Sequence, residues 1–580
     1  LNNLYLMMLT WSSSTDNYQA TLDRKQRLLK RILADHPDNL DWLVNWGNTA
    51  GKSNEVRLAD FWQGSVPLNR AIRVAPAFTL AGKEMIDDFI EQILATDQAA
   101  EQINALIPGF KESYRKRYLD AWQQFALNFY QGSSALGGPL DWQTAVDLQA
   151  TGRNPFFSLL DRMAEELDPF KEMESMPDWF FLVNYYKEMA NYAPADRAES
   201  GGKNPLVKLA LKAVGKAGAA GKAVAGAGKT ALKTQKKLNK GKKKGGALTD
   251  EERLAVLEQA GALLGQYRQL IESIVFNSAV RSVSFTSIAS MYTNPDNPAL
   301  GESALAQSYS TIRQFQGLLG KRSRRNEAFW VLFTGSVQLF REYMTSEAAC
   351  ELQDRWENRF LAGLQGVPGY KKSDFLYGEG GHLWTFKDAE LNPFVKPRFG
   401  AGFVPVRADG ETFPLDLGLL EYLSRGDDFR KQQQSQYTVI IKAQPTSTNP
   451  EALYLPRRTV LELQCEDGTR QLENLNFAQD KAFQWGQSCT DATLLINVGR
   501  YTLEKRYGGI QGFPHFLRDF QSGQKRFVPA DFPLLEDRLT EYKVKYIDVR
   551  YQFRGQRPVI RTLAASELKP PRYIADCWSS

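Results

Sequence analysis

The chain has 580 residues, of which 43% are hydrophobic and 24% charged, so roughly two to four domains with ordinary cores are expected. No apolar run reaches the roughly 20 residues that a membrane-spanning helix needs. The formal net charge is +6, but 13 lysines lie between Lys203 and Lys244, and removing them leaves −7. The acidic remainder argues against a general nucleic-acid-binding surface, and we expect no nucleic-acid partner.

The first residues resemble the middle of a helix rather than a start. Leu4–Leu9 is apolar, and neither a methionine nor a basic leader with a cleavage site precedes it. We therefore expect the targeting information and a membrane anchor to lie upstream of Leu1 in a longer parent chain.

The part of the chain up to about residue 432 is predicted to be helical. An apolar stripe with spacings of four, four and three indicates one buried helix face, formed by Tyr114, Tyr118, Trp122 and Phe125. Thr249 and Glu252 have the spacing of a capping box, which predicts a helix start. A long helical stretch is predicted over residues 326–364, with a break near Thr345.

Residues 201–248 interrupt the predicted helices with a low-complexity sequence of lysine, alanine and glycine. This composition is typical of a flexible, solvated insertion. The functional alternative is a basic arm that contacts anionic lipid headgroups or another polyanion, and each lysine near a lipid surface contributes about 1 kcal/mol. Gly226–Thr230 resembles the end of a phosphate-binding loop, but the first glycine of that motif and the preceding strand are missing. We expect neither a nucleotide site nor a cofactor.

Around residue 433 the sequence changes to short β-branched and aromatic segments separated by turn residues. These segments are Tyr437–Gln444, Thr459–Cys465, Ala492–Val498 and Lys543–Phe553. They predict the strands of a small sandwich. The predicted fold class is α+β and multidomain, with a long helical-bundle module followed by a C-terminal all-β domain. We divide the chain into a helical domain (1–200), the flexible insertion (201–248), a second helical domain (249–432) and the β-sandwich domain (433–580).

Motifs for catalysis or metal binding are absent from the sequence. The three histidines, His36, His382 and His515, do not stand in a metal-ligand pattern, and the four cysteines have no C-x-x-C spacing. We therefore predict no catalytic, metal or cofactor site and no enzymatic activity. A periplasmic cell-wall-acting hydrolase with an unmarked pair of carboxylates in a cleft remains the alternative, because one sequence does not show which carboxylates converge.

Two cysteines, Cys465 and Cys489, lie near predicted strands of the same domain. In an oxidising compartment they could form a disulfide that stabilises the fold by roughly 3 kcal/mol. Two unpaired cysteines are an equally good interpretation, because the sequence does not define connectivity.

A series of local patterns runs along the helical part. Leu4–Leu9 (LYLMML) is similar to a YLML helix, Ala75–Gly82 follows P-x-x-F-T-x-x-G with one residue fewer after the proline, and Tyr114–Phe125 follows Y-x-x-x-Y-x-x-x-W-x-x-F. Asn154–Phe156 stands where a Ser-Pro-apolar pattern is expected, and Leu352–Trp356 follows L-Q-x-x-W.

The series continues into the C-terminal part. Gly380–Phe386 and Leu391–Phe394 form a Gly-Gly turn followed by L-N-P-F, with Glu379 in place of a proline. Phe483–Gly486 and the Gly-rich Gly508–Phe520 come later. In this order the patterns resemble the periplasmic region of the IcmF/TssM family of type VI secretion systems.

The resemblance implies a structural scaffold in the periplasm of a Gram-negative bacterium, anchored in the inner membrane upstream of this region. It implies self-association into a multimer, an inner-membrane partner (TssL-like) and an outer-membrane lipoprotein (TssJ-like) that docks on the C-terminal β domain. For the docking surface we select aromatic and arginine residues typical of interfaces, Tyr501, Arg506, Tyr507 and Phe513.

The sequence departs from the family pattern at three places. These departures bear on which subfamily it resembles and on the details of the partner interface, more than on the family itself. The segment Val367–Glu379 is shortened, Trp485 is followed directly by Gly486 without a proline, and the Lys-rich insertion has no counterpart in the pattern.

Overall fold

The computed structural model describes residues 39–94, 100–173, 176–193, 250–368, 372, 375–378, 380–486, 488–566 and 568–578, with a few positions between 20 and 35. The YLML segment, the Lys-rich insertion and Thr249 lie outside these residues. The chain forms two compact units, Leu1–Ala279 with Glu302–Tyr343, and Val280–Gly301 with Met344–Ser580. The predicted α+β multidomain fold, helical first and β-sandwich last, is confirmed. None of the described helices has the length and apolarity to cross a membrane.

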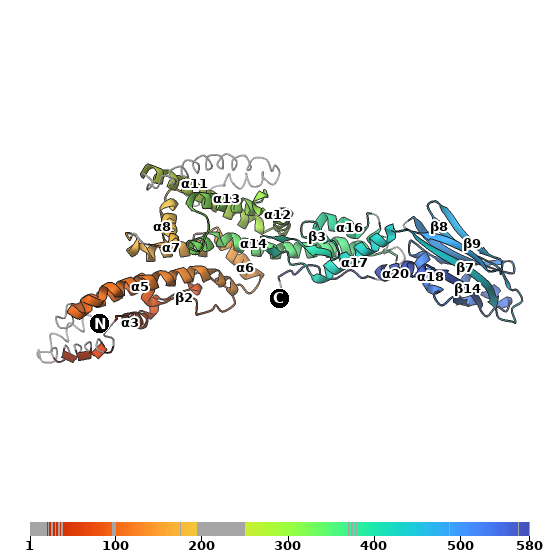
Figure 1. The fold of residues 1–580 in the computed structure, drawn as a ribbon, viewed down its shortest axis with the longest axis horizontal. Coiled ribbons are helices and arrows are strands. Elements are labelled where there is room, and N and C mark those ends of the chain that lie inside the picture. The colour runs from red at the N-terminus through yellow and green to blue at the C-terminus, as the bar shows by residue number, and fades with distance from the viewer. Residues whose placement is uncertain are drawn as a thin grey trace. The chain divides into compact units, whose positions relative to one another are not determined.

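The first unit is helical, with one two-stranded sheet (Figure 1). Its elements are α3 (Trp42–Ala50), η1 (Lys52–Asn54), β1 (Val56–Arg57), η2 (Leu58–Asp60), β2 (Arg73–Val74), η3 (Pro76–Phe78), α4 (Leu80–Leu94), α5 (Ala100–Asn128), η4 (Phe129–Ala135), α6 (Pro139–Gln149), α7 (Pro155–Glu166), η5 (Asp168–Phe170), α8 (Asp178–Ala190), α11 (Asp250–Ser278), α13 (Ala304–Leu319) and the first part of α14 (Glu327–Arg355).

The predicted aromatic stripe of α5 is buried and holds the segment that precedes α4. Trp122 donates from Nε1 to the carbonyl of Phe78 at 2.9 Å, and the Tyr114 hydroxyl donates to the carbonyl of Ala77. A Cβ on Gly82 would lie 1.9 Å from the Pro76 carbonyl oxygen, so this close approach requires glycine. Two of the patterns noted in the sequence therefore contact each other.

A buried asparagine starts α7. The Asn154 side chain accepts from the amides of Phe156 and Phe157, and its Nδ2 donates to Ser336 Oγ at 3.1 Å. The same side chain thus caps one helix and bonds to another, α14.

The second unit begins with helices and small sheets (Figure 1). These elements are α12 (Arg281–Thr293), η6 (Pro298–Leu300), the end of α14, η7 (Trp356–Leu361), η8 (Ala362–Leu364), α16 (His382–Phe386), η9 (Lys387–Leu391), β3 (Val395–Arg398), β4 (Gly402–Pro405), β5 (Arg407–Ala408), β6 (Glu411–Thr412) and α17 (Leu417–Gln434). The break predicted near Thr345 is wrong, because α14 continues to Arg355. Buried neighbours such as Met344 and Ala348 offset the weak helix preference of threonine there.

The rest of the second unit is a sandwich of two antiparallel four-stranded sheets, with strand orders β10-β7-β14-β13 and β12-β11-β8-β9. Its elements are β7 (Tyr437–Thr448), β8 (Pro456–Cys465), β9 (Gly468–Asn474), β10 (Gln479–Trp485), β11 (Cys489–Val498), β12 (Tyr501–Tyr507), α18 (Gly512–Asp519), β13 (Gln524–Phe527), η10 (Pro529–Asp531), η11 (Pro533–Leu535), α19 (Glu536–Glu541), β14 (Ile547–Arg554) and α20 (Gln556–Ser566).

Alternating side chains of the two sheets form one core. Val439 and Ile441 of β7 are buried against Leu461 and Leu463 of β8 and against the inward side chains of β11. The outward residues between them are mostly polar, which is the pattern of a half-exposed antiparallel sheet. Register is fixed by this alternation, since a shift of one residue would expose the whole apolar set.

Candidate interaction surface

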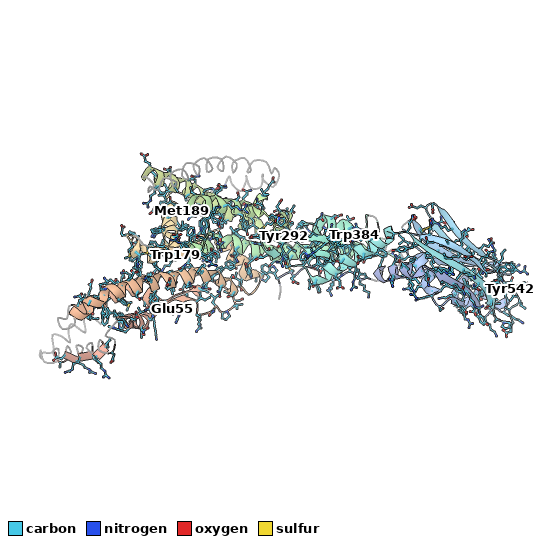
Figure 2. All side chains as sticks on the ribbon, viewed as in Figure 1. Glu55, Trp179, Met189, Tyr292, Trp384 and Tyr542 are labelled. Carbon is cyan, nitrogen blue, oxygen red and sulfur yellow. A yellow bond between two sulfur atoms is a disulfide. The ribbon has the colours of Figure 1, made fainter. Side chains whose placement is uncertain are left out.

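Four connections of the sandwich meet at one end of its sheets. Thr448 at the end of β7 pairs with Ile547 at the start of β14, and Val498 at the end of β11 pairs with Pro456 at the start of β8. The connections are residues 449–455, 475–478, 499–500 and 528–546. We call them the loop end. Tyr542, labelled in Figure 2, marks this end of the sandwich, while α18 and α20 lie at the other (Figure 1).

The loop end carries exposed apolar side chains. Among the described residues of the sandwich, 437–566, every exposed large apolar side chain except Ile440 lies in these connections. Their exposed fractions are 60% for Leu453, 43% for Tyr454, 65% for Leu455, 49% for Leu475, 70% for Phe477, 43% for Val528 and 99% for Leu534. Such a concentration at one end, beside mostly polar outer sheet faces, is typical of an interaction site.

A tyrosine cluster lies among these residues. The rings of Tyr454 and Tyr542 are 4.5 Å apart between centroids, and those of Tyr501 and Tyr542 are 5.5 Å apart. Arg500 donates to the Tyr501 hydroxyl at 2.9 Å, and its guanidinium lies 5.1 Å from the centre of that ring. Tyrosine and arginine are the side chains that most often contribute large binding energies in protein interfaces.

Two asparagines, the buried Asn449 and the partly buried Asn476, hold the backbone of the loop end. Asn449 donates to the Lys543 carbonyl at 2.9 Å and accepts from the Lys545 amide at 2.7 Å, which joins the β7–β8 connection to the segment before β14. Asn476 accepts from the Thr446 amide at 3.0 Å and donates to the Pro456 carbonyl at 2.7 Å.

Asn476 also has a positive φ of 65°, a conformation that asparagine tolerates better than most residues. Its neighbours Leu475 and Phe477 are both exposed. The loop end is therefore pre-organised, and ordering its backbone on binding a partner would require little additional entropy.

Two ion pairs lie near the loop end. Lys545 lies 3.6 Å from Glu451, and Arg538 lies 2.9 Å from Glu541. A hydrogen bond from the Asn449 side chain, a backbone hydrogen bond and the charge of Lys545 lower the pKa of Glu451. Paired rim charges beside an apolar centre are the usual anatomy of a protein–protein interface.

The structure separates the four residues that the sequence suggested for partner binding. Tyr501 lies at the loop end. Arg506 is exposed near the opposite end of β12 and pairs with Asp491 through Nε at 2.8 Å. Tyr507 is only 9% exposed and donates to Asp519 at 3.0 Å, and Phe513 in α18 is fully buried. Because Tyr507 and Phe513 belong to the sandwich core, we remove them from the candidate surface.

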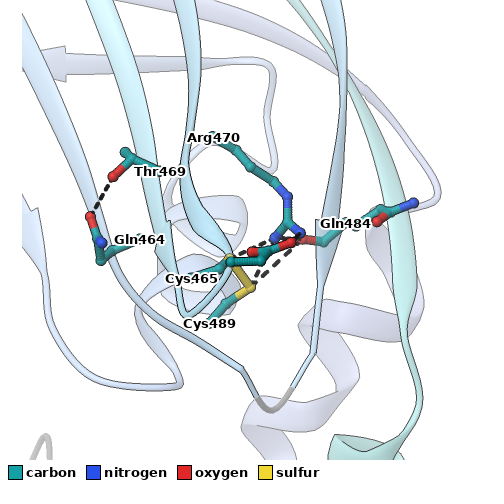
Figure 3. The surroundings of a disulfide bond; sticks show 7 residues. Gln464, Cys465, Thr469, Arg470, Gln484 and Cys489 are labelled. Atoms are coloured by element: carbon teal, nitrogen blue, oxygen red, sulfur yellow. Dashed lines mark hydrogen bonds and ion pairs between the residues drawn. A yellow bond between two sulfur atoms is a disulfide. The ribbon is translucent and has the colours of Figure 1, made fainter.

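The Cys465–Cys489 disulfide joins β8 and β11 at the end of the sandwich opposite the loop end (Figure 3). The Arg470 guanidinium lies over the two sulfur atoms and also donates to the Gln484 carbonyl at 2.9 Å. A second disulfide, Cys350–Cys577, has a sequence separation of 227 residues. All four cysteines of the chain are therefore paired. The sequence analysis did not suggest this second pair, since neither pattern nor spacing relates these cysteines.

Sequence reasoning also missed the apolar loops. The signal was available in Leu453-Tyr454-Leu455, an apolar run placed between a turn and Pro456 rather than inside a predicted strand. Tyr507 was selected because it is an aromatic residue of the β domain, but its side chain packs in the sandwich core and is not available to a partner.

A cavity of about 620 Å³ lies in the first unit, between α7 and the segment from η1 to η2. Four carboxylates line it, those of Glu55, Asp60, Asp161 and Glu165. Glu55 pairs with Arg73 at 2.9 Å, and burial raises the pKa of Asp161. Among the described residues no group of three or more His, Cys, Asp or Glu side chains is placed to hold a metal ion.

No family model matches the chain, and no curated protein matches it. A chain of a solved structure described as "Type VI membrane complex" is similar over 93% of this chain and 91% of its own, with 11% identity and a TM-score of 0.40. This likeness is too distant to assign a function to the chain.

Proposed function

We propose that the chain is a structural scaffold of a type VI secretion membrane complex and a member of the IcmF/TssM family. In this proposal it lies in the periplasm, self-associates, is connected to an inner-membrane partner through an upstream anchor, and docks an outer-membrane lipoprotein on its β domain. It acts mechanically and catalyses no reaction.

The observation that carries the proposal is the pre-organised loop end. Exposed apolar residues, a tyrosine cluster and paired rim charges occur together on loops whose backbone is held by Asn449 and Asn476. A scaffold that docks another protein needs such a surface, and the family resemblance assigns docking to this domain. The pairing of all four cysteines agrees with a periplasmic location, because disulfides persist in oxidising compartments.

The test is binding of the full chain to the soluble part of the outer-membrane lipoprotein encoded in the same gene cluster, measured by calorimetry. Leu455→Asp and Phe477→Asp place charges in the centre of the surface, and each is expected to weaken binding by at least about 30-fold. Phe399→Asp is the matched control, because Phe399 is fully exposed on the β3–β4 turn, outside the loop end. A folded wild-type chain that does not bind, or a control that loses as much affinity, would contradict the assignment.

The cavity with four carboxylates favours one second candidate, a hydrolase that acts on the cell wall. A carboxyl group with a raised pKa beside other carboxylates is the arrangement that glycan-cleaving acid–base pairs use. Release of soluble fragments from purified peptidoglycan by the wild-type chain, lost in Asp161→Asn and in Glu165→Gln, would support this function. Equal background release from all three proteins would reject it.

A further inference from the structure

The last described residues, 568–578, run back from α20 to α14 rather than ending on the β domain. We call them the C-terminal strap. Two of its residues, Ile574 and Ala575, are buried. The strap and the residues that it contacts, in α14, η7 and the segment before α17, all belong to the second unit.

One side of the strap is held by the residues of the L-Q-x-x-W pattern. Gln353 donates to the Arg572 carbonyl at 3.0 Å and accepts from the Ile574 amide at 2.8 Å. Trp356, which is fully buried, donates from Nε1 to the Pro571 carbonyl at 2.8 Å. These side chains bind the backbone of the strap, so this pattern in the sequence has a structural role as the receptor for the C-terminus.

The other side of the strap pairs with the segment before α17. The Asp416 amide donates to the Ile574 carbonyl at 2.9 Å, and the Asp576 amide donates to the Pro414 carbonyl at 3.0 Å. Leu415 and Ala575 form an antiparallel bridge. The strap is therefore a short strand inserted between these residues and α14.

The end of the strap is attached covalently. Cys577 forms its disulfide with Cys350 on α14, and the neighbouring Trp578 donates to Glu347 at 2.7 Å. Glu347, Cys350 and Gln353 are spaced by three residues, so they lie along one face of the helix. That face binds the strap from its middle to its end.

The position of the strap in the chain gives this attachment a mechanical meaning. The sandwich begins at Tyr437, with two residues between it and Gln434 at the end of α17, and its last strand leads through α20 into the strap. Without the strap, the α17–β7 junction would be the only covalent connection of the sandwich to the rest of the second unit, and beside it α20 packs on α17. With it, the sandwich is connected at both of its chain ends.

We propose that the C-terminal strap is a covalent clasp that makes the attachment of the sandwich to α14 a two-point attachment. Force or torque applied at the loop end is then shared between the α17–β7 junction and the strap. Opening the Cys350–Cys577 bond releases the strap end and lets the sandwich pivot about the junction. The proposal concerns rigidity within the second unit and holds whichever partner the loop end binds.

The test compares the full wild-type chain with Cys577→Ser, which leaves Cys350 in place on α14, and with Cys465→Ser/Cys489→Ser as the matched control. Hydrogen exchange is followed at the amides of Ile574 and Asp576. We expect exchange there to become at least about tenfold faster in Cys577→Ser and to stay at the wild-type rate in the control.

The second readout is the distance distribution between fluorophores attached through non-natural amino acids at Leu534 and Phe399, both exposed and both in the second unit. The distribution is expected to broaden in Cys577→Ser and to remain narrow in the control. Unchanged exchange and an unchanged distribution in Cys577→Ser would overturn the clasp. If Cys577→Ser does not fold, Trp356→Phe, which removes only the indole donor to Pro571, is expected to give a smaller acceleration at Ile574, and no acceleration would equally overturn it.

Discussion

Asn476 gives the most direct test of a pre-organised loop end. The substitution Asn476→Ala removes the acceptor for the Thr446 amide and the donor to the Pro456 carbonyl, and it places alanine at a φ of 65°. Asn476→Gly removes the same two hydrogen bonds and leaves the backbone conformation unstrained. The pair of variants therefore separates the hydrogen bonds from the conformational preference.

The magnitudes can be worked from these contacts. Each hydrogen bond contributes about 1 kcal/mol net, so the two together account for about 2 kcal/mol in either variant. A non-glycine residue without a local hydrogen-bonding side chain costs roughly 1 kcal/mol more in the left-handed region. We expect Asn476→Ala to lower the free energy of unfolding of the sandwich by about 3 kcal/mol and Asn476→Gly to lower it by about 2 kcal/mol.

Native-state hydrogen exchange of β7 and β8 amides in the full chain measures this quantity for the sandwich apart from the helical unit. The wild-type chain and both variants are compared under the same conditions. The reasoning is refuted if Asn476→Ala exchanges like the wild type, since the loop would then hold its shape without the side chain. Equal losses for alanine and glycine would refute only the conformational contribution.

Three further substitutions test packing, charge and capping. Gly82→Ala should lower the midpoint of thermal unfolding, with more than about 2 kcal/mol lost to the backbone clash, whereas Gly109→Ala, with open space around its Cβ, should be neutral or stabilising by up to about 1 kcal/mol. Hydrogen bonds from Arg526 lower the pKa of Asp548, so this carboxylate stabilises the fold above the unfolded pKa of about 4 and the stabilisation is lost as pH falls through the folded value. Denaturant titrations at neutral and acidic pH should therefore show a smaller pH dependence in Asp548→Asn, and an unchanged dependence would contradict the assignment. Asn154→Ala should cost about 1 to 3 kcal/mol in denaturant unfolding of the first unit, and a loss below about 0.5 kcal/mol would show that the cap is dispensable.

The secondary structure of the sandwich could be predicted where the apolar pattern was strong. The four predicted segments correspond to β7, β8, β11 and β14, whose inward positions carry large apolar side chains. Strands β9, β10, β12 and β13 were not predicted, because polar residues fill most of their positions and only a few anchors, such as Leu472 and Phe483, face the core. Edge strands need fewer apolar residues, and their sequences therefore resemble loops.

The candidate surface could be predicted only in part, for a related reason. The sequence placed interface-type residues in the domain that carries the loop end, but Tyr507 and Phe513 are as suitable for a core as for an interface, and only burial decides between the two roles. Tyr501 belongs to the surface because a strand starts there and leaves the ring beside Tyr542, a contact across about 40 residues of sequence. Neither the burial of Tyr507 and Phe513 nor the contact between Tyr501 and Tyr542 can be inferred from the spacing of residues in the sequence.

Two of the patterns that carry the family resemblance share one physical property in this structure. Trp122 donates to the backbone of the segment before α4, and Gln353 and Trp356 bond to the backbone of the C-terminal strap. Almost any residue can supply the backbone carbonyl or amide in such a contact. The side chain that binds it, in contrast, must keep its type and position. A protein built from such contacts would therefore resemble its relatives in short aromatic and glutamine patterns and differ from them in the stretches between those patterns. This is the form in which the resemblance occurs here, and the strap shows that one such pattern closes the fold rather than binding a partner.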